Sequence, residues 1–148
     1  MKVLGFDYPD DLFYWLERDM WARVCESGHV RVGITAFGVR ISGSFFMCRP
    51  KPIGTEVMQG QTVAVVELNK SVVTVKTPVS GVVRAINPLL AEHPEQIEHS
   101  PYDQGWLVEI EPTQWHEDVA CLHHGAALAD AATTRMRLEN LDFSEGHA

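Results

Sequence analysis

Lys70 is the residue whose position most favours a specific chemistry, because it stands between two runs rich in β-branched residues, 62–68 and 71–77. Asn69 precedes it, and two strands joined by a short segment with Asn, which tolerates a positive φ, predict a tight hairpin. Such a hairpin would hold the primary amine of Lys70 in solvent on a rigid support. We therefore interpret Lys70 as an attachment point for a prosthetic group; the alternative is an ordinary solvated lysine at a turn.

Further strands are predicted around this hairpin from the alternation of apolar and polar residues. A first hairpin joins 21–24 to 29–34 through the turn Glu26-Ser27-Gly28. Pro9 followed by two aspartates indicates a short helical turn within 9–18. The remaining expected strands are 45–48, 81–86 and 105–110.

The C-terminal part of the chain changes to a helical period. Thr113 is placed to cap a first helix, and the alanine-rich run 126–140 supports a second one. The residues that share one face of the first helix, and that we expect to pack toward the core, are Trp115, Val119 and Leu122. Several short strands followed by helices predict an all-β barrel or sandwich with a helical C-terminal appendage.

Composition and charge exclude several classes of protein. The chain has 148 residues, with 12 Lys plus Arg against 20 Asp plus Glu and a formal charge of −8. This balance disfavours nucleic acid, because phosphate binding depends on clustered cations. No apolar run approaches the roughly 20 residues that span a bilayer, so no membrane partner is expected. Asp7 comes too early for a secretory signal.

Cysteine usage predicts a reducing compartment. Cys25, Cys48 and Cys121 are odd in number and widely spaced, which favours neither a disulfide framework nor a zinc knuckle. We therefore expect free thiols and a cytoplasmic protein.

Clusters that carry catalysis or bind metals are not evident in the sequence. Cys121, His123 and His124 lie near His116, but adjacent histidines point to different faces of a helix and no carboxylate completes a zinc set. No metal site is expected. Since the sequence also lacks a nucleophile elbow, a phosphate-binding loop and a supported Cys-His pair, we expect neither catalytic residues nor an independent enzyme.

The spacing of glycines around Lys70 gives its amine a more specific interpretation. Gly54, Gly60 and Gly81 form with Lys70 and Pro78 the pattern G-x5-G-x9-K-x7-P-x2-G. This pattern resembles lipoyl-carrier domains, in which the modified lysine lies at a hairpin tip and glycines flank it at these intervals. Biotin carriers share that fold but usually place the lysine between two methionines, so biotin is the weaker alternative. We interpret the glycines as structural, because they permit turns that side chains would obstruct.

Other segments extend this resemblance to one family. Over roughly residues 20–112, their order and spacing look like the glycine cleavage system H protein family. The run Pro101 to Leu107 contains a Tyr-x-x-Gly-Trp signature that resembles this family closely. The other matching segments are Trp21 to Val24, Val32 to Thr35, Glu67 to Lys70, and Val83 to Pro94.

The resemblance implies a mainly β, barrel-sandwich hybrid of the lipoyl- and biotinyl-carrier type. We expect an N-terminal extension at 1–20, the H-like carrier domain at 21–112 and a C-terminal helical appendage at 113–148. It also implies covalent lipoate on Lys70, attached by a lipoate ligase or a lipoyl transferase. Glu67 matches a family position and is a candidate for recognition by that enzyme; the alternative is a solvated acid at a strand end.

A lipoylated protein of this kind carries an intermediate between partner enzymes on a swinging arm and turns over no substrate alone. The five-membered ring cannot reach the relaxed disulfide dihedral, so it is strained and readily reduced to a dithiol. In glycine cleavage the cargo is the aminomethyl group left by decarboxylation, and the partners are the P, T and L proteins. Lys76 is interpreted as an ordinary surface lysine.

The sequence departs from the family pattern at several positions. Ala36 and Ser44 replace acidic residues, Met20 stands where Glu commonly precedes the tryptophan, and Leu68-Asn69 replaces Ser-Val. The segments 9–14 and 51–54 look similar to H-like lipoate-binding proteins of heterodisulfide-reductase-like sulfur oxidation. In that pathway the cargo is a sulfur species and the partner is the heterodisulfide-reductase-like complex. The pathway stays open at this point, and an unmodified H-like binding or regulatory module is a further alternative.

Overall fold

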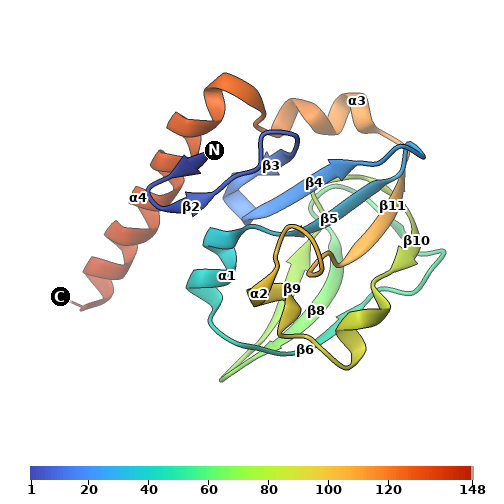
Figure 1. Cartoon of the computed structure of the whole chain (residues 1–148), viewed down its shortest axis with the longest axis horizontal. Helices are drawn as coiled ribbons and strands as arrows, with labels where there is room; N and C mark the ends of the chain where they lie inside the picture. Colours follow the sequence, from blue (N-terminus) through green and yellow to red (C-terminus); the bar gives the residue numbers. More distant parts are fainter. Residues whose placement is uncertain (148) are drawn as a thin grey trace.

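The computed structural model describes residues 1–147 and arranges their strands in three sheets (Figure 1). The largest has the order β3-β4-β5-β11-β10-β7, a second has the order β6-β8-β9, and β1 and β2 form a small third one. All strand pairings are antiparallel. The strands are β1 (Lys2–Val3), β2 (Phe6–Asp7), β3 (Phe13–Trp15), β4 (Met20–Val24), β5 (Val30–Ile34), β6 (Phe45–Pro50), β7 (Glu56–Val57), β8 (Thr62–Leu68), β9 (Val72–Lys76), β10 (Gly81–Ile86) and β11 (Val108–Pro112).

The six-stranded and three-stranded sheets enclose one apolar core. Val32 of β5, Val66 of β8 and Ile110 of β11 are almost completely buried in the same cluster. Burial of such side chains is the main favourable contribution to folding, at about 25 cal/mol per Å² of apolar surface. The protein therefore has the mainly β, barrel-sandwich fold that the sequence predicts.

Short helices connect the strands, and one long helix ends the described chain. Thr35 caps α1 (Ala36–Ser42), because its side-chain oxygen accepts a hydrogen bond from the Gly38 backbone N–H at 3.1 Å. The other helices are η1 (Leu16–Arg18), η2 (Pro88–Ala91), α2 (Gln96–His99), α3 (Trp115–Asp118), η3 (Val119–Cys121), η4 (Gly125–Ala127) and α4 (Leu128–His147).

Both predicted hairpins are present. Strands β4 and β5 pair with Ala22 opposite Val32, and β8 and β9 pair with Val66 opposite Val73. The strands expected at 45–48 and 81–86 are confirmed as β6 and β10. The strand expected at 105–110 begins only at Val108, in β11.

The helical turn predicted within 9–18 is largely wrong. Phe13–Trp15 is an extended strand, and only Leu16–Arg18 forms a 3₁₀ turn. Tyr14 pairs with Trp21 of β4 on one side, and on the other side it exchanges backbone hydrogen bonds with His123. Pairing on both sides satisfies the backbone in the extended form, so tertiary contacts outweigh the local helix-start signal.

Two further details of the helices differ from expectation. Thr113 does not cap the helix that follows, which begins at Trp115 after Gln114 and has no side-chain cap. The helix expected at 126–140 is present, but α4 starts at Leu128 and continues to His147. Of the three residues expected to face the core, Trp115 packs against it, whereas the other two are half-buried.

A second apolar cluster joins the two ends of the described chain. Val3, Tyr8 and Leu12 from the N-terminal segment pack with Leu128 and Met136 of α4. Figure 1 shows β1 and β2 lying against α4. Within residues 1–147, no helix is both long enough and apolar enough to cross a bilayer.

Candidate functional site

Lys70 lies at the tip of the β8–β9 hairpin, as predicted. Glu67 pairs with Val72, and the Leu68 backbone N–H donates to the Ser71 carbonyl oxygen at 2.8 Å. Asn69 and Lys70 form the exposed connection between the two strands. Among the residues that the structure describes, Lys70 has no ion pair and no side-chain hydrogen bond, so its amine is open to a modifying enzyme.

The expected positive φ at Asn69 is wrong. Within residues 1–147 the only non-glycine residues with a positive φ are Leu4 and Asp19. The turn is therefore closed by the Leu68–Ser71 hydrogen bond without a left-handed residue at its tip.

The hairpin is held rigidly by the rest of its sheet. Strand β6 pairs with the other edge of β8, with Cys48 opposite Val66. Val63, Val66 and Val75 point into the core and are nearly fully buried. The buried thiol of Cys48 is shielded from water, and this burial raises its pKa to about 12.

The glycines that flank the hairpin have structural roles, as predicted. Gly54 and Gly60 adopt φ values of 94° and 93°, a region that side-chain-bearing residues rarely occupy. Gly81 instead permits close approach of two strands, because a Cβ atom there would overlap the carbonyl oxygen of Glu111. These positions fix the strands that carry Lys70 relative to the larger sheet.

Two other charged residues of the hairpin differ in their surroundings. Glu67 is exposed on the outer face, opposite Val72, so it is available to a protein that approaches Lys70. The Lys76 side chain is half-buried, and its Nζ donates to Thr62 Oγ1 at 3.1 Å. A lysine held in this way is less accessible than Lys70.

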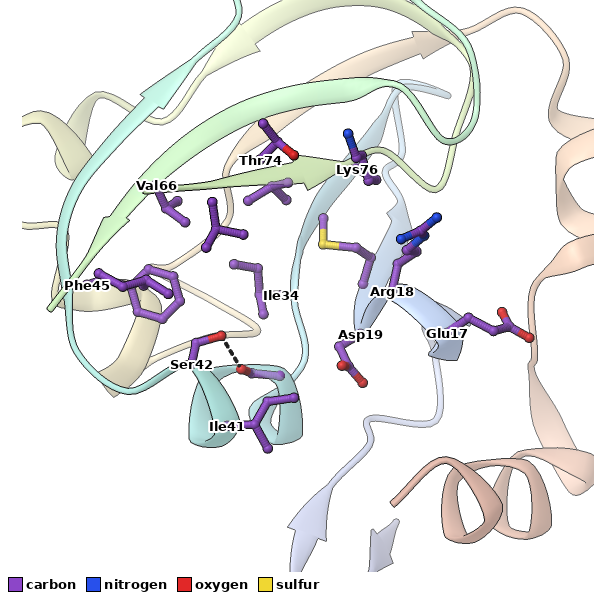
Figure 2. Close-up of a pocket in the computed structure, with 15 residues that line it drawn as sticks. Glu17, Arg18, Asp19, Ile34, Ile41, Ser42, Phe45, Val66, Thr74 and Lys76 are labelled. Carbon is purple, nitrogen blue, oxygen red and sulfur yellow. Dashed lines mark hydrogen bonds between the residues drawn. The ribbon is translucent and has the colours of Figure 1, made fainter. Parts of the chain in front are cut away.

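A cleft of about 320 Å³ opens beside the hairpin (Figure 2). Its walls come from β8 and β9, from β4 and β5, and from η1 and α1. Leu68 and Val73, which flank the tip on its two strands, both line it. The other apolar lining residues are Met20, Ile34, Ile41, Phe45, Val66 and Val75.

Four charged residues also line this cleft, namely Glu17, Arg18, Asp19 and Lys76. Asp19 is buried, and Arg135 of α4 donates to its Oδ2 at 2.7 Å. Burial raises the pKa of Asp19, and the Arg135 guanidinium opposes that rise in part. The cleft was not anticipated from the sequence, because residues that form its walls are separated by as many as 59 positions.

The Tyr-x-x-Gly-Trp run at Tyr102–Trp106 lies outside the hairpin and supports the fold. Tyr102 donates its hydroxyl hydrogen to the Asp7 carbonyl oxygen at 2.5 Å and accepts from the Ala36 N–H at 3.0 Å. Trp106 stacks against the guanidinium of Arg31, 4.2 Å from the ring centroid. The motif therefore ties loops together and contributes no group to the hairpin tip.

The C-terminal histidines have structural partners. His123 pairs through its backbone with Tyr14, and His124 places Nδ1 2.8 Å from the Leu12 carbonyl oxygen and stacks on Phe13. Over residues 1–147, no group of three or more His, Cys, Asp or Glu side chains is placed to hold a metal ion.

The tip and the cleft together fit an acyl arm on Lys70. An extended lipoyl-lysine is roughly 14 Å long, at about 1.25 Å per bond along a zigzag chain. Thr74 of the cleft lies four residues from Lys70, about 13 Å at roughly 3.3 Å per residue of strand. The apolar lining suits a hydrocarbon arm and its ring sulfurs, so the residues present are compatible with lipoate.

Comparisons with known proteins agree with this geometry. The family model described as "Glycine cleavage H-protein" matches residues 13–134. Glycine cleavage system H protein 3 of Aquifex aeolicus is 38% identical over 120 residues, covering 79% of this chain and 74% of the relative. Glycine cleavage system H protein 2 of the same organism is 31% identical over 144 residues, covering 97% and 89%.

A solved structure is similar as well. The crystal structure of a glycine cleavage system H protein from Mycobacterium marinum superposes with a TM-score of 0.66 at 30% sequence identity. The match covers 72% of this chain and 87% of that one.

Proposed function

The chain belongs to the glycine cleavage H-protein family of lipoyl carriers, and from this we propose that Lys70 is the residue that carries lipoate. The observation that supports this assignment is the position of Lys70, exposed and unpaired within the described chain, at the tip of a hairpin whose strands are anchored in the core. Lys2 and Lys51 lie elsewhere, and Lys76 is hydrogen-bonded to Thr62. Of the four lysines, Lys70 alone lies at the tip of a β-hairpin.

Lipoate supplies a dithiolane whose ring disulfide opens to a dithiol that can hold a transferred group. In this proposal the protein positions the lipoyl arm, and the reactive groups belong to lipoate. Its hairpin presents the amine, and the cleft beside Leu68 and Val73 offers the arm a partly enclosed, mainly apolar groove. In this proposal the chain is a carrier that partner enzymes act on, as in its family, and has no turnover of its own.

We further propose that Glu67 contributes to recognition by the lipoate ligase or lipoyl transferase that modifies the chain. Glu67 is exposed three residues before Lys70, on the same arm of the hairpin. An enzyme that reads the hairpin tip would meet this carboxylate first on β8. The division into an extension at 1–20, a carrier domain at 21–112 and an appendage at 113–148 stays a prediction, and so does the cytoplasmic location.

Two pathways use carriers of this type. In glycine cleavage the partners are the P, T and L proteins and the cargo is an aminomethyl group. In heterodisulfide-reductase-like sulfur oxidation the partner is that complex and the cargo is a sulfur species. The departures at Met20 and at Leu68-Asn69 favour the second pathway slightly.

Intact mass of the protein purified from its native host tests the attachment. We expect one added lipoyl amide, its loss in Lys70→Arg and its retention in the matched control Lys76→Arg. An unmodified mass in a host with active lipoylation would overturn the proposal and favour an unmodified binding or regulatory module. Purification from the native host matters because a foreign ligase can fail to recognise the hairpin.

The pathway is tested separately with the lipoylated protein. Reconstitution with P, T and L proteins and glycine gives decarboxylation if the chain serves glycine cleavage. Absence of decarboxylation, together with turnover by a heterodisulfide-reductase-like complex supplied with a reduced sulfur compound, would assign the second pathway.

A further inference from the structure

One end of the cleft is positively charged, and this charge affects which group the arm can carry there. Figure 2 shows Arg18 and Lys76 at the end of the cleft away from Phe45, with Thr74 between Phe45 and Lys76. Within the described residues, neither cation forms an ion pair with a carboxylate. Lys76 donates to Thr62 Oγ1, and Arg18 lies 5.9 Å from the centroid of the Trp15 ring.

The two acids of the cleft do not balance these cations. Asp19 is already paired with Arg135 at 2.7 Å. Figure 2 shows the carboxylate of Glu17 pointing away from the apolar lining. Counted along β9 from Lys70, an arm of roughly 14 Å, estimated from bond lengths, ends beside Thr74. The end of the cleft next to Thr74 is bordered by Arg18 and Lys76, and among the described lining residues no unpaired carboxylate points toward them. This local sign is opposite to the charge of −8 on the whole chain.

We propose that this cleft favours a negatively charged group at the end of the arm, such as an S-sulfonate or a persulfide, over an aminomethyl ammonium. Arg18 and Lys76 are then the residues that set this preference. The inference rests on the proposed attachment of lipoate to Lys70. It follows from Coulomb attraction in a partly desolvated groove, where charges are screened less than in bulk water.

Sulfite provides a probe of this preference that needs no partner enzyme. Its sulfur attacks one sulfur of the lipoyl ring, the S–S bond breaks, and a new bond to the SO₃⁻ group forms while the second ring sulfur leaves as a thiolate. The disulfide is reduced by two electrons and the sulfite sulfur is oxidised by two, so no other reactant is required. The equilibrium constant is measured by intact mass over a series of sulfite concentrations.

Intact mass before sulfite addition first establishes that the arm is present on Lys70, so an unmodified protein overturns the proposed function and not the charge preference. With the arm present, we expect the sulfite equilibrium constant on the protein to exceed that of free lipoamide. Arg18→Gln and Lys76→Gln should each lower it about two- to fivefold, the effect of one exposed charge pair. The difference in sulfite equilibrium constant between the unsubstituted protein and these two variants should decrease as ionic strength rises.

Arg49→Gln is the matched control. Arg49 is exposed on β6 and does not line the cleft, so this variant changes the net charge equally and should leave the equilibrium constant unchanged. A cationic probe completes the comparison. The reduced arm, formaldehyde and ammonium combine to give an S-aminomethyl ammonium group and water, and this equilibrium should not exceed that of free dihydrolipoamide.

Equal sulfite equilibrium constants for the protein and free lipoamide would overturn the proposal. It would also be overturned if Arg18→Gln and Lys76→Gln had no larger effect than Arg49→Gln, or if the protein stabilised the ammonium adduct more than the sulfonate.

Discussion

The guanidinium of Arg135 lies 2.7 Å from the carboxylate of Asp19, and this contact ties the C-terminal helix to the wall of the cleft. Arg135 also donates to the Leu16 carbonyl oxygen at 3.1 Å and to Glu139 Oε2 at 3.1 Å. Burial lowers the tendency of Arg135 to carry charge, but Asp19 and Glu139 together leave its pKa raised. The backbone of Asp19 has a positive φ of 54° and ends the 3₁₀ turn Leu16–Arg18, where its N–H donates to the Leu16 carbonyl oxygen at 3.1 Å.

Arg135→Met should therefore destabilise the protein by about 3 kcal/mol, because it leaves the buried Asp19 carboxylate without its partner. The free energy of unfolding in urea measures this change. Arg137→Met is the control on the same helix, since Arg137 is exposed, and it should change stability by no more than about 0.5 kcal/mol. Equal effects of the two substitutions would show that the Asp19 contact does not hold α4.

Gly81→Ala should cost about 2–3 kcal/mol, because the added Cβ must displace the backbone of β11 at Glu111. Gly54→Ala serves as a comparison in which no atom lies within 4 Å of the added carbon, and its strain from a positive φ should cost about 1 kcal/mol. Urea unfolding of both variants measures the difference. If Gly54→Ala proved the more damaging, the close approach of β10 to β11 would not be the decisive constraint.

Glu67→Gln should slow lipoylation without changing the stability of the protein. The Glu67 side chain is exposed and makes no hydrogen bond to the described residues, so replacing its carboxylate leaves the hairpin intact. We expect roughly a tenfold lower rate of modification by the purified ligase or transferase, about 1.4 kcal/mol of lost recognition. The exposed turn residue Glu26 gives the control Glu26→Gln, and a similar rate for both variants would remove Glu67 from the recognition surface.

Stability should fall in alkaline solution. Burial raises the pKa of Tyr8 to about 12 from an ordinary value of 10.0, and that of Cys48 to about 12 from 9.0. Burial raises the pKa of Tyr14 as well. The unfolded chain therefore loses these protons first, and the stabilising contribution, complete below pH 9, is lost progressively as the pH rises toward 12.

Unfolding midpoints in urea from pH 8 to pH 10.5 measure this loss. Cys48→Val should reduce the slope against pH, because it removes one of the buried groups. Cys121→Ser should leave the slope unchanged, because Cys121 is exposed. A midpoint that stays constant over this range would contradict the assignment of these groups to a water-excluded interior.

The hairpin and Lys70 could be predicted from the sequence because their signal is local. The β-branched runs on either side of Asn69 predict two strands from neighbouring residues alone, and these strands pair as expected. The positions of Gly54 and Gly60 are likewise local, since each is a turn that requires a positive φ. These features define where the amine is presented.

The remaining errors have a common physical cause. Phe13–Trp15 reads as the start of a helix, but its extended form depends on pairing with Trp21 and with His123, over a hundred residues away. The helix Ala36–Ser42 was not predicted, although Thr35 is a favourable cap, because the segment is short and contains Gly38. Where a short segment carries signals for more than one secondary structure, tertiary contacts determine which one it adopts.

The cleft could not be predicted for the same reason. Its walls combine residues of η1, α1 and the β8–β9 hairpin, and Asp19 is held by Arg135 from 116 positions away. No periodicity in the sequence reports a contact at that separation. Arg18 and Lys76 are far apart in the sequence, and only the fold brings their two positive charges to one end of the same groove.

The second apolar cluster has a consequence for how the chain assembles during synthesis. The sheet β6-β8-β9 is contained within residues 45–76, so its contacts are local and close early. Val3 and Tyr8, in contrast, meet their partners in α4 only after Leu128 and Met136 have been synthesised. The hairpin that bears Lys70 can thus be complete while the amino-terminal segment still awaits its helix, and the two ends of the chain close the fold last.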